Sequence, residues 1–332
     1  MEVTGQQRIV VEDATQVGEA RRTAALLSAH AGLSETESGR LAIIVNELGS
    51  NLGKHARHGE LLIQHLRGVQ RSGVEVLSLD RGPGMDLAAS LRDGHSTAGT
   101  RGEGLGAVRR LADEFDADTG SHGSAVMARI WAGGTGEGGA QIGAACQPIA
   151  SEHLCGDGWD CRMTASRTRL LLVDGLGHGP LAARAAEVAT EAFARTDALP
   201  GPEAIVHALH AALRPTRGAA LAVAELDRIS RTLRFCGVGN IAGVLQDPKG
   251  AARGLVSHNG IAGHEARRIQ EFAVRWPAGG ILVMHSDGIT AHWTLKAESG
   301  LRPRHAGVIA GVIFRDFRRI SDDATVIVLR EP

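Results

Sequence analysis

The sequence predicts an α+β protein built from two domains, and three observations lead to this expectation. The chain has 332 residues, which is more than the roughly 100–200 residues of an ordinary compact domain. Residues 132–140 read Ala-Gly-Gly-Thr-Gly-Glu-Gly-Gly-Ala, a composition typical of a flexible linker. Helical and strand patterns occur on both sides of it. We therefore expect one domain over residues 1–131, a glycine-rich linker over 132–140 and a second domain over 141–332.

Before the linker, the pattern predicts an α/β sandwich with a long loop in its middle. Ser34 followed by Glu37 is a capping-box pattern that marks the start of the second helix. The segment 81–104 is rich in Gly and polar residues and is expected to form the loop. The expected elements are a strand near 7–11, helices near 14–30 and 35–57, strands at 61–63 and 74–79, a helix at 105–113 and a strand at 124–131.

After the linker, strands outnumber helices, which favours two sheets flanked by helices. The run 314–319 contains three Arg residues and is expected to be a solvated helix end rather than a nucleic-acid site, because it is short and isolated. The expected strands lie near 141–146, 159–165, 168–173, 219–227, 231–238, 241–246, 279–285 and 325–330, and the expected helices near 180–195, 202–213 and 304–318.

Composition and charge exclude several classes of protein. Hydrophobic residues make 43% of the chain and charged residues 22%, as in a globular protein and not a disordered one. The 36 Lys and Arg balance 37 Asp and Glu, so no long-range field attracts nucleic acid or an acidic membrane. The four cysteines show no zinc or disulfide spacing. Without a leader pattern or an apolar run of about 20 residues, we expect a cytoplasmic protein.

Three motifs before the linker point to a nucleotide site. Glu47 and Asn51 are four residues apart on the second helix, so a carboxylate and an amide share one face and can hold a metal ion or water. Asp80 ends a strand and is followed by Gly82 and Gly84. The glycines Gly102, Gly104 and Gly106 open the next helix, where backbone amides favour phosphate. Each motif alone also fits a solvated helix face or ordinary turn glycines.

Taken together and in this order, the three motifs resemble the ATP-binding fold shared by gyrase, histidine kinases and MutL, the GHKL fold, over roughly residues 8–131. The resemblance implies that Asp80 contacts adenine, that Asn51 holds Mg²⁺ and that Glu47 orients or activates the attacking group. Residues 93–99 would form part of a lid over the phosphates. The glycines of both boxes, Gly82, Gly84, Gly102, Gly104 and Gly106, would surround ATP.

Within that fold, the chain is most similar to the anti-sigma-factor and stressosome-type serine kinases, because the domain is small and its expected lid is short. These kinases phosphorylate a Ser or Thr on a small STAS-domain protein. Ser124 stands where a Thr is common, a mild departure. Whether this chain transfers phosphate or only binds ATP and a partner is left open by these residues. Kinases of this type often dimerise, so a homodimer is a further possibility.

After the linker, four acidic motifs follow or precede expected strands: Asp157, Asp174, Asp287 and the pair Asp322 and Asp323. Any single Asp-Gly is typical of an ordinary turn. Carboxylates gathered at one end of a sheet, however, can hold two divalent cations with a bridging water. A buried carboxylate at a sheet end is costly without a cation, so the four motifs together favour a metal site.

These motifs resemble the PP2C-type metal-dependent phosphatases of the bacterial sporulation and stress-response branch (SpoIIE-like), over about residues 141–330. The resemblance implies that Asp174 bridges two Mn²⁺ or Mg²⁺ ions and that the Gly175 carbonyl binds the second. Asp287 and Asp322 would complete the first metal site, and Asp157 would act through water. His178 could position phosphate or donate a proton, or it could merely cap the following helix; both interpretations stay open.

Together the two halves suggest a partner-switching regulator that sets the phosphorylation state of one STAS-domain protein in both directions. The linker would let each site reach the same partner in turn. The alternative keeps only the phosphatase as an enzyme and makes the ATP-binding half a nucleotide-gated module that sequesters a sigma factor or switch protein. The expected cofactors are ATP with Mg²⁺ before the linker and two Mn²⁺ or Mg²⁺ after it, and no nucleic acid or membrane is expected as a partner.

Overall fold

The structure is a computed structural model that describes residues 5–68, 71–91, 104–134, 140–296 and 300–331. The chain forms two compact units. The N-terminal unit comprises Met1–Gly138 with Pro303–Arg315, and the C-terminal unit comprises Gly139–Arg302 with Asp316–Pro332. This division differs from the boundaries expected from the sequence in one segment, Pro303–Arg315, which groups with the N-terminal unit.

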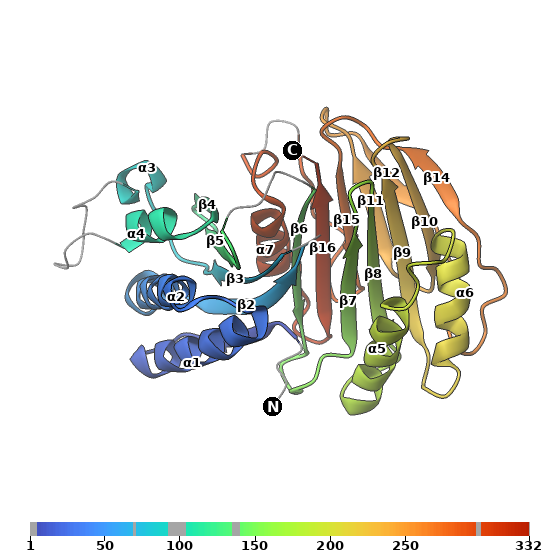
Figure 1. Ribbon diagram of the computed structural model, residues 1–332, viewed down its shortest axis with the longest axis horizontal. Coiled ribbons are helices and arrows are strands. Elements are labelled where there is room, and N and C mark those ends of the chain that lie inside the picture. The colour runs from blue at the N-terminus through green and yellow to red at the C-terminus, as the bar shows by residue number, and fades with distance from the viewer. Residues whose placement is uncertain (1–4, 69–70, 92–103, 135–139, 297–299, 332) are drawn as a thin grey trace. The chain divides into compact units, whose positions relative to one another are not determined.

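The N-terminal unit is an antiparallel sheet with helices, as the sequence predicts (Figure 1). The strands pair in the order β1-β2-β3-β5-β4. The expected capping box of Ser34 and Glu37 is present at α2, and Asp13 with Gln16 forms a second one at α1 that was not predicted from the sequence. The elements are β1 (Gln7–Val10), α1 (Ala14–Ala31), α2 (Glu35–His55), β2 (Glu60–Arg67), β3 (Ser72–Leu79), α3 (Leu87–Ser90), α4 (Gly104–Leu111), β4 (Glu114–Gly120) and β5 (Gly123–Trp131).

The alternation of side chains along β3 divides this unit into two layers. Val74 and Val76 point into the core beneath α1 and α2, where they join buried residues such as Leu27 and Ile44. The odd-numbered residues of the strand, Glu75, Leu77 and Leu79, face the opposite side of the sheet. The sheet is therefore apolar on the helix side and carries a buried charge on the other side.

The helix α7 (Ala306–Phe317) lies against that second face. Its two glycines allow the close approach: a Cβ on Gly311 would stand 3.0 Å from both Leu77 and Leu79, and one on Gly307 would stand 2.8 Å from Met127 Sδ. Phe314 and Arg315 are 0% and 4% exposed. The expectation of a solvated helix end at 314–319 is therefore wrong for these two residues, because α7 is packed on all sides along Ala306–Arg315.

The C-terminal unit contains two sheets, as expected (Figure 1). One has the order β13-β10-β9-β8-β7, with β14 beside β10, and the other β12-β11-β15-β16-β6. The elements are β6 (Gln141–Gln147), β7 (Asp157–Met163), β8 (Arg167–Gly175), α5 (Pro180–Phe193), α6 (Pro202–Leu213), β9 (Ala219–Asp227), β10 (Thr232–Val238), β11 (Ala242–Gln246), β12 (Ala252–Leu255), β13 (Ser257–His258), β14 (Phe272–Arg275), β15 (Ile281–His285) and β16 (Ala324–Arg330).

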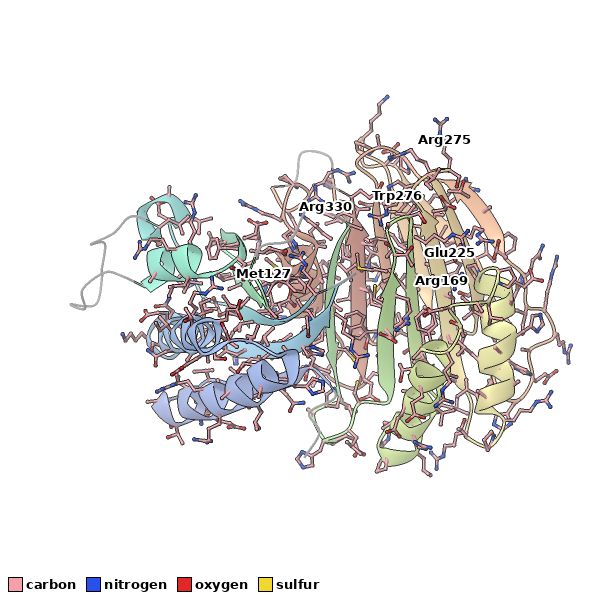
Figure 2. All side chains as sticks on the ribbon, in the orientation of Figure 1. Met127, Arg169, Glu225, Arg275, Trp276 and Arg330 are labelled. Atoms are coloured by element: carbon pink, nitrogen blue, oxygen red, sulfur yellow. The ribbon has the colours of Figure 1, made fainter. Side chains whose placement is uncertain are left out.

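Two apolar layers hold this unit together. Side chains of both sheets, among them Leu170, Phe235 and Leu282, form the core between the sheets. The other face of the first sheet packs on α5 and α6 through residues such as Leu171 and Phe193. In the same sheet, Arg169 on β8 and Glu225 on β9 lie side by side as a buried ion pair (Figure 2). No helix among the described residues is long and apolar enough to cross a membrane.

Candidate functional site

The aspartates predicted after the linker lie at the ends of strands from both sheets of the C-terminal unit. Asp157 opens β7 and is the direct partner of Asp174 near the end of β8. Asp287 follows β15, and Asp322 with Asp323 precedes β16, the neighbour of β15. Ser286 joins the two groups because its hydroxyl donates a hydrogen bond of 2.7 Å to Asp157 Oδ2. We call Asp157, Asp174, Asp287, Asp322 and Asp323 the acid cluster.

Glycines allow the loops of the acid cluster to approach one another closely. The Gly175 N–H donates to the Gly156 carbonyl at 2.9 Å, and a Cβ on Gly175 would stand 2.3 Å from the Ala182 carbonyl oxygen. A Cβ on Gly288 would stand 1.9 Å from the Asp323 carbonyl oxygen. Any side chain at these two positions would push backbone aside. The Asp-Gly pairs noted in the sequence therefore serve packing at the strand ends.

Electrostatically, the acid cluster is a set of like charges held together. Burial, followed by the charges of Asp157 and Asp287, raises the pKa of Asp174 to about 9. Burial raises the pKa of Asp157 to about 7, against the hydrogen bond from Ser286, which lowers it. Burial also raises the pKa of both Asp322 and Asp323. Ionised together, these carboxylates repel one another, and a bound cation would relieve that repulsion.

The residues of the acid cluster fit a divalent cation. Asp157 is 4% exposed, and its Oδ1 has no hydrogen-bond partner among the residues that the structure describes; a buried carboxylate oxygen of this kind needs a cation or a donor. Among the described residues, no group of three His, Cys, Asp or Glu side chains is already arranged to hold a metal ion. Mg²⁺ usually keeps several waters and takes only one or two carboxylates directly. An open arrangement of oxygen ligands is therefore suited to a hard, hydrated cation.

Sequence reasoning missed two partners of the acid cluster and left the role of a third residue open. Asn240 Nδ2 donates to Asp287 Oδ2 at 2.8 Å, and nothing in the sequence sets this Asn apart from an ordinary turn residue. Ser286 is the other missed partner. The third residue is Asp323. Its carboxylate accepts hydrogen bonds from the N–H groups of Ile149 and Gly156 at 2.8 and 2.9 Å and so fixes the loop that precedes Asp157.

His178 lies in the loop between Asp174 and α5. Its ring is hydrogen-bonded to Glu152 at 3.1 Å, and its side chain is 61% exposed. The first turn of α5 is preceded by Gly179 and has no side-chain cap. The helix-capping interpretation of His178 is therefore wrong. The positive charge that His178 can carry also favours the ionised form of Asp323.

The N-terminal unit brings together three of the residues predicted to bind a nucleotide. A Cβ on Gly104, at the start of α4, would stand 3.6 Å from Glu47 Oε2 and 3.7 Å from Asn51 Oδ1. The Glu47 and Asn51 side chains on α2 therefore face the first residue of α4. Gly106 is buried in the first turn of the same helix. Backbone amides at a helix start beside a carboxylate and an amide suit a phosphate with its cation.

Asp80 lies at the end of β3, in a separate set of contacts. Its Oδ1 accepts the Gly82 N–H at 2.6 Å, and its side chain is partly exposed. Gly84 has φ +77°, and a Cβ there would stand 2.4 Å from the Gly120 carbonyl oxygen. Only a glycine tolerates this conformation and contact together. Gly102 and the expected lid at 93–99 lie outside the described residues.

Comparison with known proteins identifies relatives of both halves. Residues 10–130 match the histidine kinase-like ATPase domain, and residues 164–332, about half of the chain, match Stage II sporulation protein E (SpoIIE). The serine/threonine-protein kinase RsbT of Bacillus subtilis (strain 168) is 30% identical over 102 residues, which cover 30% of this chain and 77% of RsbT. The phosphoserine phosphatase RsbX of the same organism is 24% identical over 141 residues, which cover 42% of this chain and 69% of RsbX.

Solved structures agree with these matches. A chain from work on the bacterial stressosome as a modular system is 28% identical, with a TM-score of 0.54, over 58% of this chain and 100% of that one. The structure of RsbX in complex with magnesium has a TM-score of 0.51 and 19% identity over 57% of this chain and 94% of that one, which shows a shared fold. The chain thus belongs to the SpoIIE family of PP2C-type phosphatases in its C-terminal half and carries a histidine kinase-like ATPase domain in its N-terminal half.

Proposed function

We propose that this chain is a partner-switching regulator with two opposing activities on one phosphoprotein. The C-terminal half hydrolyses a phosphoserine or phosphothreonine, and the N-terminal half transfers phosphate from ATP to the same residue. The substrate is a STAS-domain protein, either an anti-sigma antagonist or a stressosome scaffold. Support comes from the pairing, in one chain, of a half related to the kinase RsbT with a half that shares the fold of the phosphatase RsbX.

The acid cluster is the observation that carries the phosphatase part. We assign Asp174 and the Gly175 carbonyl to two Mn²⁺ or Mg²⁺ ions, and Asp287 and Asp322 to the first of them. We assign Asp157, which is 4% exposed and held by the Ser286 hydroxyl, to the same metal site through a water molecule. Bound divalent cations supply charge for the phosphoryl oxygens and lower the pKa of a water that attacks phosphorus. The protein side chains hold this arrangement open at the ends of four strands.

The grouping of Glu47, Asn51 and Gly104 supports the kinase part. We assign Asn51 to Mg²⁺ and the start of α4, at Gly104 and Gly106, to the phosphates of ATP. Asp80, partly exposed and held by the Gly82 amide, contacts adenine. Glu47 lies on the phosphate side of this arrangement, one helical turn before Asn51. That is the position from which a carboxylate can orient the hydroxyl of a protein substrate toward the transferred phosphate.

The experiment follows phosphate in both directions. Purified full-length protein is incubated with γ-labelled ATP, Mg²⁺ or Mn²⁺ and a STAS-domain protein encoded beside it, and the wild type is compared with Asp174→Asn and Glu47→Ala. The matched control is Glu19→Ala, an exposed carboxylate on the neighbouring helix α1. We expect label to accumulate on the STAS-domain protein only when Asp174 is replaced, and to disappear when Glu47→Ala is added to that variant.

Two results would contradict the proposal. If Asp174→Asn removes phosphate from the labelled STAS-domain protein as fast as the wild type, the acid cluster is not the phosphatase site. If no variant transfers label while the wild type still releases phosphate from a phosphorylated STAS-domain protein, the N-terminal half is a nucleotide-gated binding module and not a kinase.

A further inference from the structure

Two segments distant in the sequence lie side by side at the border of the acid cluster. The strands β8 and β9 pair as far as Gly175 opposite Ala219. Beyond that pair, the Leu176 N–H donates to the Gly218 carbonyl at 3.0 Å. The loop that begins at Asp174 and Gly175 is therefore bordered by the residues that precede β9. Side chains of these residues therefore lie next to the loop that follows Asp174 and Gly175.

Arg217 is the charged residue of this border. A Cβ on Gly177 would stand 3.6 Å from Arg217 Nη1, so the guanidinium lies over the loop that follows Asp174 and Gly175. The residue is exposed and has no hydrogen bond or ion pair with a described residue. Arg169 and Arg234 of the same unit, by contrast, are both paired with Glu225. Arg217 thus offers a guanidinium without a described partner beside the loop that follows Asp174 and Gly175.

An apolar side chain accompanies this guanidinium. Leu176 is 49% exposed, although its backbone is fixed by the hydrogen bond to Gly218. A leucine held open to solvent on a rigid loop loses little conformational entropy when a partner covers it. The border therefore carries one cationic and one apolar contact within two adjacent loops.

We propose that Leu176 and Arg217, here called the substrate edge, bind the phosphorylated protein substrate. Arg217 takes the phosphate group, and Leu176 packs on an apolar side chain next to the phosphorylated Ser or Thr. A guanidinium matches phosphate oxygens with two parallel hydrogen bonds. This inference rests on the phosphatase part of the proposed function. It adds the class of substrate that the site would recognise: a phosphoprotein with an apolar side chain next to its phosphorylated Ser or Thr.

The test separates the two contacts by substrate size. Steady-state kinetics with Mn²⁺ are measured on p-nitrophenyl phosphate and on a serine-phosphorylated STAS-domain protein, and inorganic phosphate binding is measured by calorimetry. The variants are Arg217→Gln, Arg217→Lys and Leu176→Ser. Arg214→Gln is the control for an exposed Arg at the end of α6, and Ile229→Ser is the control for an apolar residue that is 83% exposed in the turn after β9.

We expect Arg217→Gln to raise KM for both substrates and to weaken phosphate binding about tenfold, with kcat within about twofold of wild type. Arg217→Lys restores part of the loss because the charge remains. Leu176→Ser raises KM about fourfold for the phosphoprotein alone. Both controls behave as wild type.

Equal KM values and equal phosphate binding for Arg217→Gln and Arg214→Gln would overturn the assignment of Arg217. Equal phosphoprotein KM values for Leu176→Ser and Ile229→Ser would overturn that of Leu176. Phosphate binding requires no turnover, so a protein that hydrolyses neither substrate disproves the phosphatase proposal while calorimetry still decides on Arg217.

Discussion

Each unit of the molecule contains a group of carboxylates at a sheet, and the two groups are built in opposite ways. In the N-terminal unit, Glu75 and Glu114 both bind Arg129, at 2.7 and 3.1 Å, and Asp116 binds Arg304 at 3.2 Å. We call Glu75, Glu114 and Asp116 with these arginines and His305 the paired cluster. In the acid cluster of the C-terminal unit, no aspartate is ion-paired with a described Arg, Lys or His.

The pKa values follow this difference. Burial favours the neutral form of Glu114, but the hydrogen bond from His305 and the charge of Arg129 outweigh it and hold the pKa of Glu114 at about 2. Burial raises the pKa of Asp157 to about 7 and that of Asp174 to about 9, and the charges of neighbouring carboxylates add to this effect instead of opposing it. Arginines of the same unit neutralise the first group, whereas we propose that cations from outside neutralise the second. The paired cluster is therefore structural, and the acid cluster is suited to function.

Replacing Asp174 is expected to have the largest effect and to break the comparison most directly. The raised pKa means that folding of the metal-free chain takes up a proton at Asp174, so its stability falls as the pH rises from about 4 to about 9. Asp174→Asn removes this cost, so the chelator-treated variant should unfold at a higher temperature than wild type at pH 8, and the difference should be much smaller at pH 5 and vanish below about pH 4. Its phosphatase activity should fall by more than about 100-fold.

Glu187→Gln is the control for this experiment, because Glu187 is an exposed carboxylate on α5 of the same unit and should change neither quantity. Thermal unfolding in chelator and hydrolysis of p-nitrophenyl phosphate with Mn²⁺ are the two measurements. A lower unfolding temperature for metal-free Asp174→Asn at pH 8 would show that the acid cluster is not under electrostatic repulsion.

Replacing Glu114 should have a smaller effect, with the opposite dependence on pH. Because the pKa of Glu114 is lowered, its contribution to stability is present above about pH 4.5 and is lost as the pH falls toward 2. Glu114→Gln should destabilise the N-terminal unit by about 2 kcal/mol at pH 7, allowing for partial exposure of the side chain, and by much less at pH 3. Hydrogen exchange in peptides from β4 and β5 measures this locally.

The matched control is Glu19→Gln, on the exposed face of α1, which should leave the exchange of β4 and β5 unchanged. An equal effect of Glu114→Gln at pH 7 and pH 3 would mean that the side chain acts by packing alone and that its ion pairs in the paired cluster do not stabilise the unit.

The fold could be predicted from the sequence wherever one local pattern decides it. Periodicity placed α1 and α2, with a capping box at the start of α2, and apolar runs placed β8, β9 and β16. The strand β4 was missed because Glu114–Gly120 reads EFDADTG, a poor strand sequence that is held in place by Arg129 and by pairing with β5. The strands β12, β13 and β14 were also missed: each has four residues or fewer, and the sequences ARGL of β12 and SH of β13 show no run of apolar residues.

The candidate sites could be predicted to the extent that glycines mark them. Asp174 and Asp287 each precede a glycine that packs against backbone, so the sequence motif and the close approach have one cause. Arg217 also precedes a closely packed glycine, Gly218, and Asn240 follows one, Gly239, but neither residue is a carboxylate of a recognised motif, and their roles depend on how separate strands come together. The burial of Phe314 and Arg315 was missed for the same reason: a helix sequence does not show how many of its faces are covered.

Asn240 provides the smallest effect and the finest comparison of the two clusters. In the paired cluster a cation holds each carboxylate, whereas Asp287 is held by the neutral amide of Asn240, at 2.8 Å. A neutral donor orients the carboxylate and leaves its charge available for a metal ion.

Asn240→Ala should therefore weaken Mn²⁺ binding and lower phosphatase activity about tenfold. Asn259→Ala, at another exposed Asn of the unit, should change neither. Mn²⁺ titration by calorimetry shows whether Asn240 positions Asp287 or only stabilises the turn before β11. Unaltered Mn²⁺ affinity in Asn240→Ala would mean that the amide only stabilises this turn and that Asp287 needs no positioning partner.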